Sequence, residues 1–186
     1  MPSPKLLILP LSLLLFGFVD PYHFKDAETG FAVDPPNNYI VMPLPPKEGS
    51  VAKALVAILR YDADVRSPTP PFCVAGLYAR EDNVERTQTE LNARMRDTGR
   101  VTNMIATFNG AYTVIADEPI ELGEVAGHQF IMEERGAAGA YEDLLQVNSS
   151  FDTPDGRIVL NCATERTNLT ANLVSFGLIR ESITLP

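Results

Sequence analysis

Hydrophobic and polar positions alternate in short runs along much of the chain, and a period of two residues is typical of β-strands with one buried face. Glycine, proline and asparagine cluster between these runs, where they favour turns and loops. Pro154 and Asp155-Gly156 stand where a hairpin turn between two such runs needs them. We therefore expect strands at residues 31–33, 39–42, 54–61, 72–79, 120–122, 129–132, 144–151 and 157–162, with proline-rich loops at 43–50 and 62–71.

A helical pattern follows the first group of strands. Asp82 and Glu85 are spaced like a capping box, in which each side chain bonds a free backbone amide at the start of a helix. The helix is expected to end at Thr98-Gly99 and to cover the sheet with one apolar face, formed by Val84, Leu91 and Met95. Residues 101–115 favour short strands, with Asn109-Gly110 as a hairpin turn.

A second helix is expected at the C-terminus. Thr167 can cap it, and apolar residues then recur at steps of four, three, three and four: Leu169, Leu173, Phe176, Ile179 and Ile183. A run of strands with one helix in the middle and one at the end predicts an α+β domain. In it, helices pack on the faces of a central antiparallel sheet. The predicted domain covers residues 20–186.

Residues 1–19 have a different composition from the rest. Lys5 is the only charged residue before Asp20, and an uncharged, mostly apolar run extends from Leu6 to Val19. This pattern is typical of a signal peptide, and Pro10 within the run disfavours a stable spanning helix. An uncleaved signal anchor and a buried N-terminal helix are the alternatives. The leader predicts a periplasmic or extracellular protein, with no membrane span beyond an N-terminal anchor.

Charge narrows the classes of partner. The 186 residues carry a formal net charge of −9, although the hydrophobic fraction of 45% is ordinary for a globular protein. Nucleic acids and anionic membrane surfaces both require a basic footprint, so neither is an expected partner.

Two cysteines, Cys73 and Cys162, lie in predicted strands. In an oxidising compartment such a pair can form a disulfide, and closing so long a loop would stabilise the fold by roughly 4 kcal/mol. Two buried free thiols are the alternative, because cysteine is often buried without a bridge.

Candidate chemistry is sparse. His128 could act as a general base with nearby carboxylates, or with Cys73 as a nucleophile, but such a residue is more often simply a polar position at the start of a strand. Glu133-Glu134 and Glu142-Asp143 could hold calcium through oxygen ligands, with solvated surface charge as the alternative. The sequence contains neither a nucleophile elbow nor a glycine-rich nucleotide motif, so no cofactor is expected.

The segment from Thr29 to Pro36 (Thr-Gly-Phe-Ala-Val-Asp-Pro-Pro) resembles the start of PsbP-like domains. The Gly156-Arg157 turn into an apolar strand, followed by a helix that closes on residues 179–183, is similar to their ends. The superfamily includes photosystem PsbP proteins, DcrB-like envelope lipoproteins and a Ran-binding nuclear-import factor. The resemblance covers residues 24–186 in layout and implies a sheet sandwiched by helices. It also implies a binding or assembly role rather than catalysis, and it transfers no functional residue.

Together these observations predict an exported, non-catalytic protein that binds an unidentified envelope protein or supports assembly. The alternative is an enzyme or metal-dependent factor using His128 and nearby carboxylates. A deep pocket that holds His128 with convergent acids would favour the alternative, whereas a shallow, exposed apolar groove would favour binding.

Overall fold

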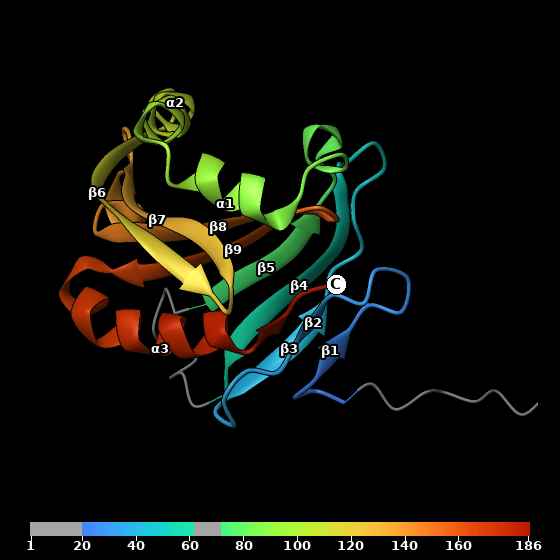
Figure 1. The fold of residues 1–186 in the computed structure, drawn as a ribbon. Helices are drawn as coiled ribbons and strands as arrows, with labels where there is room; N and C mark the ends of the chain where they lie inside the picture. The colour runs from blue at the N-terminus through green and yellow to red at the C-terminus, as the bar shows by residue number, and fades with distance from the viewer. Residues whose placement is uncertain (1–19, 62–71) are drawn as a thin grey trace, which may run out of the picture.

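The computed structural model describes residues 20–61 and 72–186, which form a seven-stranded antiparallel sheet, a three-stranded sheet and three α-helices (Figure 1). The predicted α+β class is therefore confirmed. The leader and the loop at 62–71 lie outside the described residues. In sheet order, the strands of the large sheet are β3 (Tyr39–Pro43), β4 (Ala52–Arg60), β5 (Phe72–Tyr78), β9 (Gly156–Glu165), β8 (Leu144–Thr153), β7 (Val125–Glu134) and β6 (Tyr112–Leu122).

The small sheet joins the two ends of the described chain. Its central strand β2 (Ala32–Val33) pairs with β1 (Phe24–Lys25) on one side and with β10 (Ile183–Thr184) on the other. Val33 and Ile183 lie opposite each other, and both belong to the main hydrophobic core. The C-terminal residues thus close the fold against its first strands.

The three helices are α1 (Gln88–Met95), α2 (Thr98–Phe108) and α3 (Leu169–Glu181). Figure 1 shows α1 and α2 on one side of the large sheet, and α3 with the small sheet on the other. α1 packs on β7 and β8, α2 on β6, and α3 on β9. Among the described residues, no helix has the length and apolar character required to cross a membrane.

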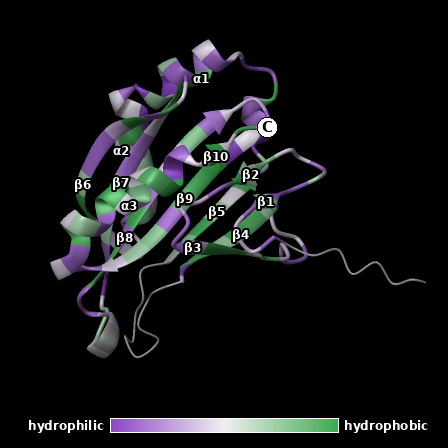
Figure 2. Cartoon of the chain, turned by 90° about the horizontal axis from the view of Figure 1, so that it is seen from below, coloured by the Kyte–Doolittle hydropathy of each residue, from purple (hydrophilic) through white to green (hydrophobic). Residues whose placement is uncertain are grey.

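The core follows from strict alternation on the central strands. Along β9 every second residue is buried, so that Ile158, Leu160 and Cys162 point to the side of α3. Phe176 and Ile179 of α3 meet them in one hydrophobic cluster with residues of the small sheet. Figure 2 shows apolar residues along the central strands of the large sheet.

The predicted hairpin at residues 144–162 is confirmed. β8 and β9 pair from Leu144↔Glu165 to Thr153↔Gly156, with the turn at Pro154-Asp155. Gly156 has a positive φ of 147°, and a Cβ there would lie 2.3 Å from the carbonyl oxygen of Tyr78, so only glycine fits.

The prediction for residues 101–115 is wrong for residues 101–108, whereas the turn at residues 109–111 and the strand from Tyr112 are present. Residues 98–108 form α2, and Asn109 is the C-cap of that helix rather than part of a hairpin turn. The helix starts at Asp97, whose carboxylate accepts a hydrogen bond from the Arg100 amide at 2.8 Å. Val101, Ile105 and Phe108 recur at helical spacing, but their types are common in strands and obscure the helical period.

The predicted helix boundaries also need correction. The capping box of α1 is formed by Thr87 and Glu90, not by Asp82 and Glu85, and Val84 is 67% exposed. Leu91 and Met95 are buried as predicted.

The C-terminal helix is confirmed, but it ends at Glu181. Ile183 therefore belongs to β10 and not to the helix. At the other end, Thr167 lies in a short 3-10 segment, and Asn168 is the N-cap without a capping side-chain bond.

Candidate functional site

Helix α2 stands between two hollows and has no fully buried residue. One hollow, which we call the His128 groove, has a volume of about 760 Å³ and lies between α2 and the β6–β7 hairpin. It is lined by Met95, Arg96, Thr98, Val101, Thr102, Ile105, Asp117, Pro119, Ile120, Glu121 and residues 126–128. The other, the arginine cavity, has a volume of about 660 Å³ and is lined by Arg80, Arg94, Asp97, Gly99, Arg100, Asn103, Met104, Thr107 and Arg157.

The antiparallel pairing of β6 and β7 positions His128. It lies opposite Pro119, and its Nε2 is 2.9 Å from Oδ2 of Asp117, two residues before Pro119 on β6. An ionised carboxylate only accepts hydrogen bonds, so Nε2 carries the proton in this pair. The His128 side chain is largely buried, and its Nδ1 has no hydrogen-bond partner among the described residues.

Aromatic rings fix the other side of His128. Its ring centroid lies 4.9 Å from that of Phe130 on the same strand. Phe130 in turn makes an edge-to-face contact with Phe108 at 5.3 Å, which attaches the C-terminal end of α2 to the sheet. The imidazole is therefore held between an acid and an aromatic pair.

The other carboxylates near the groove bind different partners. Glu118 accepts a hydrogen bond from the amide of Gln129 at 2.7 Å, and Glu121 forms an ion pair with Arg96 at 3.1 Å. Asp117 is thus the one carboxylate that bonds His128 in the described part of the chain. A catalytic or metal site would require several acids around His128, and in the described part of the chain only Asp117 contacts it.

The predicted calcium ligands are not brought together. Glu133 forms an ion pair with Arg166 at 2.6 Å, near the far end of β7 from His128. Glu142 and Asp143 are exposed in the loop before β8. Within residues 20–61 and 72–186, no group of three or more His, Cys, Asp or Glu residues could hold a metal ion. His23, near the first strand, instead contacts Asp34.

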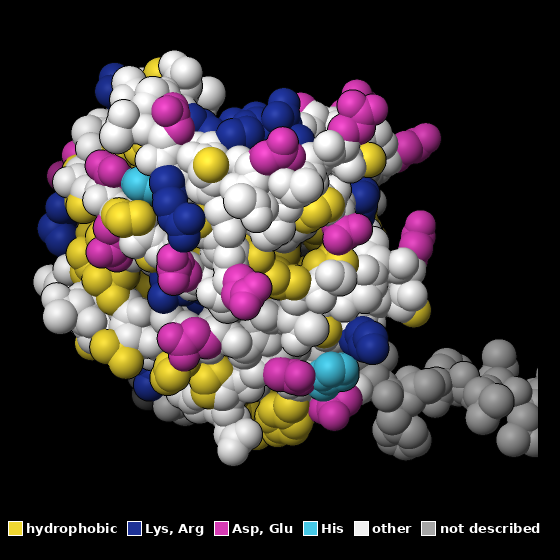
Figure 3. All heavy atoms as spheres, in the orientation of Figure 1, with side chains coloured by type: hydrophobic (Ala, Val, Ile, Leu, Met, Phe, Trp, Pro, Cys, Tyr) yellow, Lys and Arg dark blue, Asp and Glu magenta, His cyan; other side chains and the backbone are white. Residues whose placement is uncertain are grey.

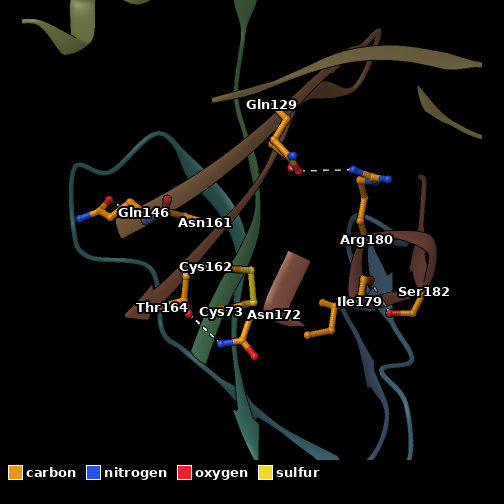
Figure 4. Close-up of a disulfide and its surroundings, with 11 residues drawn as sticks. Cys73, Gln129, Gln146, Asn161, Cys162, Thr164, Asn172, Ile179, Arg180 and Ser182 are labelled. Carbon is orange, nitrogen blue, oxygen red and sulfur yellow. Dashed lines mark hydrogen bonds between the residues drawn. A yellow bond between two sulfur atoms is a disulfide. The ribbon is translucent and has the colours of Figure 1, made fainter. Parts of the chain in front are cut away.

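Cys73 and Cys162 are direct neighbours in the register of β5 and β9, and their sulfur atoms form a disulfide (Figure 4). Their Cα atoms are 4.0 Å apart, and both side chains are buried in the core on the α3 side. A Cys73–His128 catalytic pair is therefore excluded, because no thiol is free and His128 points to the opposite face of the sheet.

The arginine cavity is built around Asp152, whose side chain is fully buried at the end of β8. Arg157 donates from Nε at 2.7 Å and from Nη2 at 3.0 Å, and Arg100 donates from Nη2 at 2.6 Å. Burial alone would raise the pKa of Asp152. The hydrogen bonds and positive charges of the two arginines outweigh burial and hold the pKa below its usual value.

Side-chain amides hold α1 and the preceding 3-10 turn (Glu81–Asn83) beside Asp152. Gln88 donates to the Asp152 carbonyl at 3.0 Å, and Asn83 donates to the carbonyls of Thr153 and Gly156. Asn92 bonds the backbone of the β6–β7 turn. These amides position Arg94, on α1, at the cavity wall.

Sequence reasoning missed the arginine cavity. A usable signal exists for one pair, because Asp152 and Arg157 flank the predicted hairpin turn and must face each other across it. Arg80, Arg94 and Arg100 come from three other elements and carry no such signal.

Neither a protein-family model nor a curated protein sequence matches the chain. Among solved structures, it is similar to cyanobacterial PsbP (CyanoP) from Synechocystis sp. PCC 6803, with a TM-score of 0.50 and 13% identity over 91% of this chain and 96% of that one. It is also similar to a protein of unknown function from Pseudomonas aeruginosa, a putative regulator, with a TM-score of 0.45 and 8% identity over 88% and 95% of the two chains. The likeness to CyanoP shows that the chain has a PsbP-like fold.

Proposed function

We propose that this chain is an exported, non-catalytic binding protein that holds a segment of an envelope partner protein in the His128 groove. In this proposal, a leader at residues 1–19 precedes one α+β domain at residues 20–186. The observation that carries the proposal is the half-buried apolar face of α2 that lines the groove. Val101 and Ile105 line the groove opposite Pro119 and Ile120, and none of the four is fully buried.

The partner segment should combine apolar and basic side chains. Asp117 and Glu121 line the groove in a chain with a net charge of −9, whereas Glu118 bonds Gln129. The Arg96 side chain at the rim is already paired with Glu121. A basic residue next to the apolar anchor would therefore meet complementary charge, which favours both specificity and the association rate.

The arrangement around His128 supports binding over catalysis. A general base needs a nucleophile or water to activate and groups that stabilise the developing charge. The groove presents His128 with one carboxylate and a wall of apolar side chains. The disulfide is compatible with a location outside the cytoplasm, where such bridges persist.

Site-specific photo-crosslinking in cells tests the proposal. A crosslinking amino acid placed at Thr102, an exposed position in the groove, should capture one partner. The same residue at Thr170, exposed on α3, should not. Ile105→Arg places a charge in the groove wall and should abolish the Thr102 crosslink, whereas Ala106→Arg on the outer face of α2 should preserve it. Equal capture at both positions, or capture that survives Ile105→Arg, would count against the groove as the binding surface.

The second candidate function is an enzyme or metal-dependent factor, and the His128–Asp117 contact is the observation that favours it. Zinc or calcium titration followed by NMR would separate the two functions. A metal role requires saturable changes in the His128 ring signals that disappear in Asp117→Asn. A binding role predicts no such saturation.

A further inference from the structure

We propose that the arginine cavity is a separate binding site for a small, polar phosphate ester, on the opposite side of α2 from the His128 groove. Four arginines from four elements line the cavity. Arg80 follows β5, Arg94 lies on α1, Arg100 in the first turn of α2, and Arg157 near the start of β9. Figure 3 shows Lys and Arg side chains gathered at the top of the molecule, beside α2.

The positive charge of the cavity exceeds the negative charge that faces it. Asp152 is shared by Arg100 and Arg157. Asp82 is shared by Arg94 at 3.1 Å and Arg80 at 3.5 Å. Two carboxylates thus serve four guanidinium groups. Asp97 also lines the cavity and caps α2 through the Arg100 backbone amide, so four positive charges face three negative ones. Such a basic cluster is unusual on a chain with a net charge of −9.

Several guanidinium donors remain unused. Nε of Arg80, Nη1 of Arg94 and Nε of Arg100 are buried and have no hydrogen-bond partner among the described residues, so a side chain must turn before its unused donor reaches a ligand. A guanidinium group presents its donors in a planar fork that matches the oxygen atoms of a phosphate. The side chains of Arg80 and Arg94 are 40% and 26% exposed, so both can turn toward a ligand that enters from solvent.

The charges around Arg100 also favour a negatively charged ligand. Burial lowers its pKa, Asp152 raises it, and the charges of Arg157 and Arg94 lower it further. The arginines therefore repel one another, and an anion between them would relieve that repulsion. Gly99 lines the cavity in the first turn of α2, where free backbone amides and the helix dipole also favour negative charge.

The size and lining of the cavity define the rest of the ligand. A volume of about 660 Å³ exceeds what a phosphate ion alone requires, so it leaves room for an attached group. Asn103 and Thr107 offer hydrogen bonds to that group, and Met104 is the one aliphatic side chain in the lining. A polyol or sugar phosphate fits this surface better than an apolar molecule does.

NMR titration of the domain with glycerol 3-phosphate and with inorganic phosphate, at constant ionic strength, tests the proposal. The amides of Gly99 and Asn103 should shift saturably. Arg94→Gln and Arg80→Gln should each weaken binding about tenfold, the effect of losing one charge-assisted hydrogen bond. Arg166→Gln is the matched control, because Arg166 is an exposed arginine that pairs with Glu133 outside the cavity. This substitution should change the affinity for the phosphate compound by less than about twofold.

Tighter binding of glycerol 3-phosphate would assign the site to an ester, and equal binding would assign it to the phosphate ion. Absence of saturable shifts at Gly99 and Asn103, or equal weakening by Arg166→Gln, would overturn the site. Thermal unfolding of each variant controls for folding, and Arg80→Gln serves if Arg94→Gln does not fold. The result does not depend on photo-crosslinking in the His128 groove, so the two proposals fail separately.

Discussion

Replacing Asp152 by asparagine tests the balance of charge at the centre of the arginine cavity. The substitution keeps the size of the side chain but removes its charge. Arg157 and Arg100 would then lose the carboxylate that accepts three of their hydrogen bonds. Their side chains are only 17% and 19% exposed, so water cannot fully replace that partner.

The expected loss is large. Removing one partner of a buried ion pair typically costs about 3–5 kcal/mol, because the remaining charge stays buried without compensation. A domain of this size has a free energy of unfolding of roughly 5–15 kcal/mol. Each kilocalorie lowers the melting temperature by roughly 2–4 °C, so Asp152→Asn should lower it by about 10 °C at pH 7. Asp155→Asn, the same change at an exposed turn residue, is the matched control and should have little effect.

The pH dependence provides a second measurement. The folded-state pKa of Asp152 lies below its ordinary value, so its contribution to stability is fully present above about pH 4. That contribution is lost as the pH falls through the folded pKa. The difference between wild type and Asp152→Asn in urea unfolding should therefore shrink as the pH is lowered below 4. A loss under about 1 kcal/mol at pH 7, or a difference that grows in acid, would refute this account of the cluster.

Four further predictions concern the core, the groove floor, the disulfide and the leader. Phe176→Ala should cost about 3–5 kcal/mol, and a variant that melts like wild type would show that this face of α3 is not buried. Gly127→Ala should cost about 1–3 kcal/mol in urea unfolding, since a Cβ there would lie 2.3 Å from the ring of Phe151; an unchanged midpoint would contradict this contact. Reduction should destabilise the protein by about 2–5 kcal/mol, and two free thiols in the denatured, unreduced protein would disprove the disulfide. A reporter active only outside the cytoplasm, fused at residue 30, should give a signal, and silence would end the export hypothesis.

Local signals explain which elements the sequence predicts correctly. The β8–β9 hairpin was recognisable because its turn residues and both alternating strands are contiguous. Helix α2 is not recognisable in the sequence, because Asn109-Gly110 also suits a hairpin turn and the helix is rich in threonine, valine and isoleucine. Its N-cap bond from Asp97 and its contact with Phe130 decide the conformation, and only the second of these is a tertiary interaction.

The sites depend on register, which the sequence predicts poorly. His128 meets Asp117 because the turn after Leu122 sets a register of β6 and β7 in which Pro119 lies opposite His128 and Asp117 opposite Phe130; the irregularity between Val114 and Ala116 lies beyond this contact. Glu133 and Glu134, predicted as calcium ligands, lie on the same strand as His128 but near its other end, so the extended backbone keeps them away from it. Candidate residues could thus be listed from the sequence, but their partners could not be assigned.

Helix α2 borders both proposed sites and is fixed to the sheet at its two ends. At its first turn, Arg100 donates a hydrogen bond to the Asp152 carboxylate. At its other end, the last residue, Phe108, packs on Phe130. Between these attachments no residue is fully buried, so the middle of the helix forms a wall for both hollows. A helix fixed at its ends can leave apolar side chains such as Ile105 only half-buried, at the wall of a groove, without losing its position. Exposed apolar area of this kind does not stabilise the isolated fold, which is the physical reason to expect that a ligand or partner covers it.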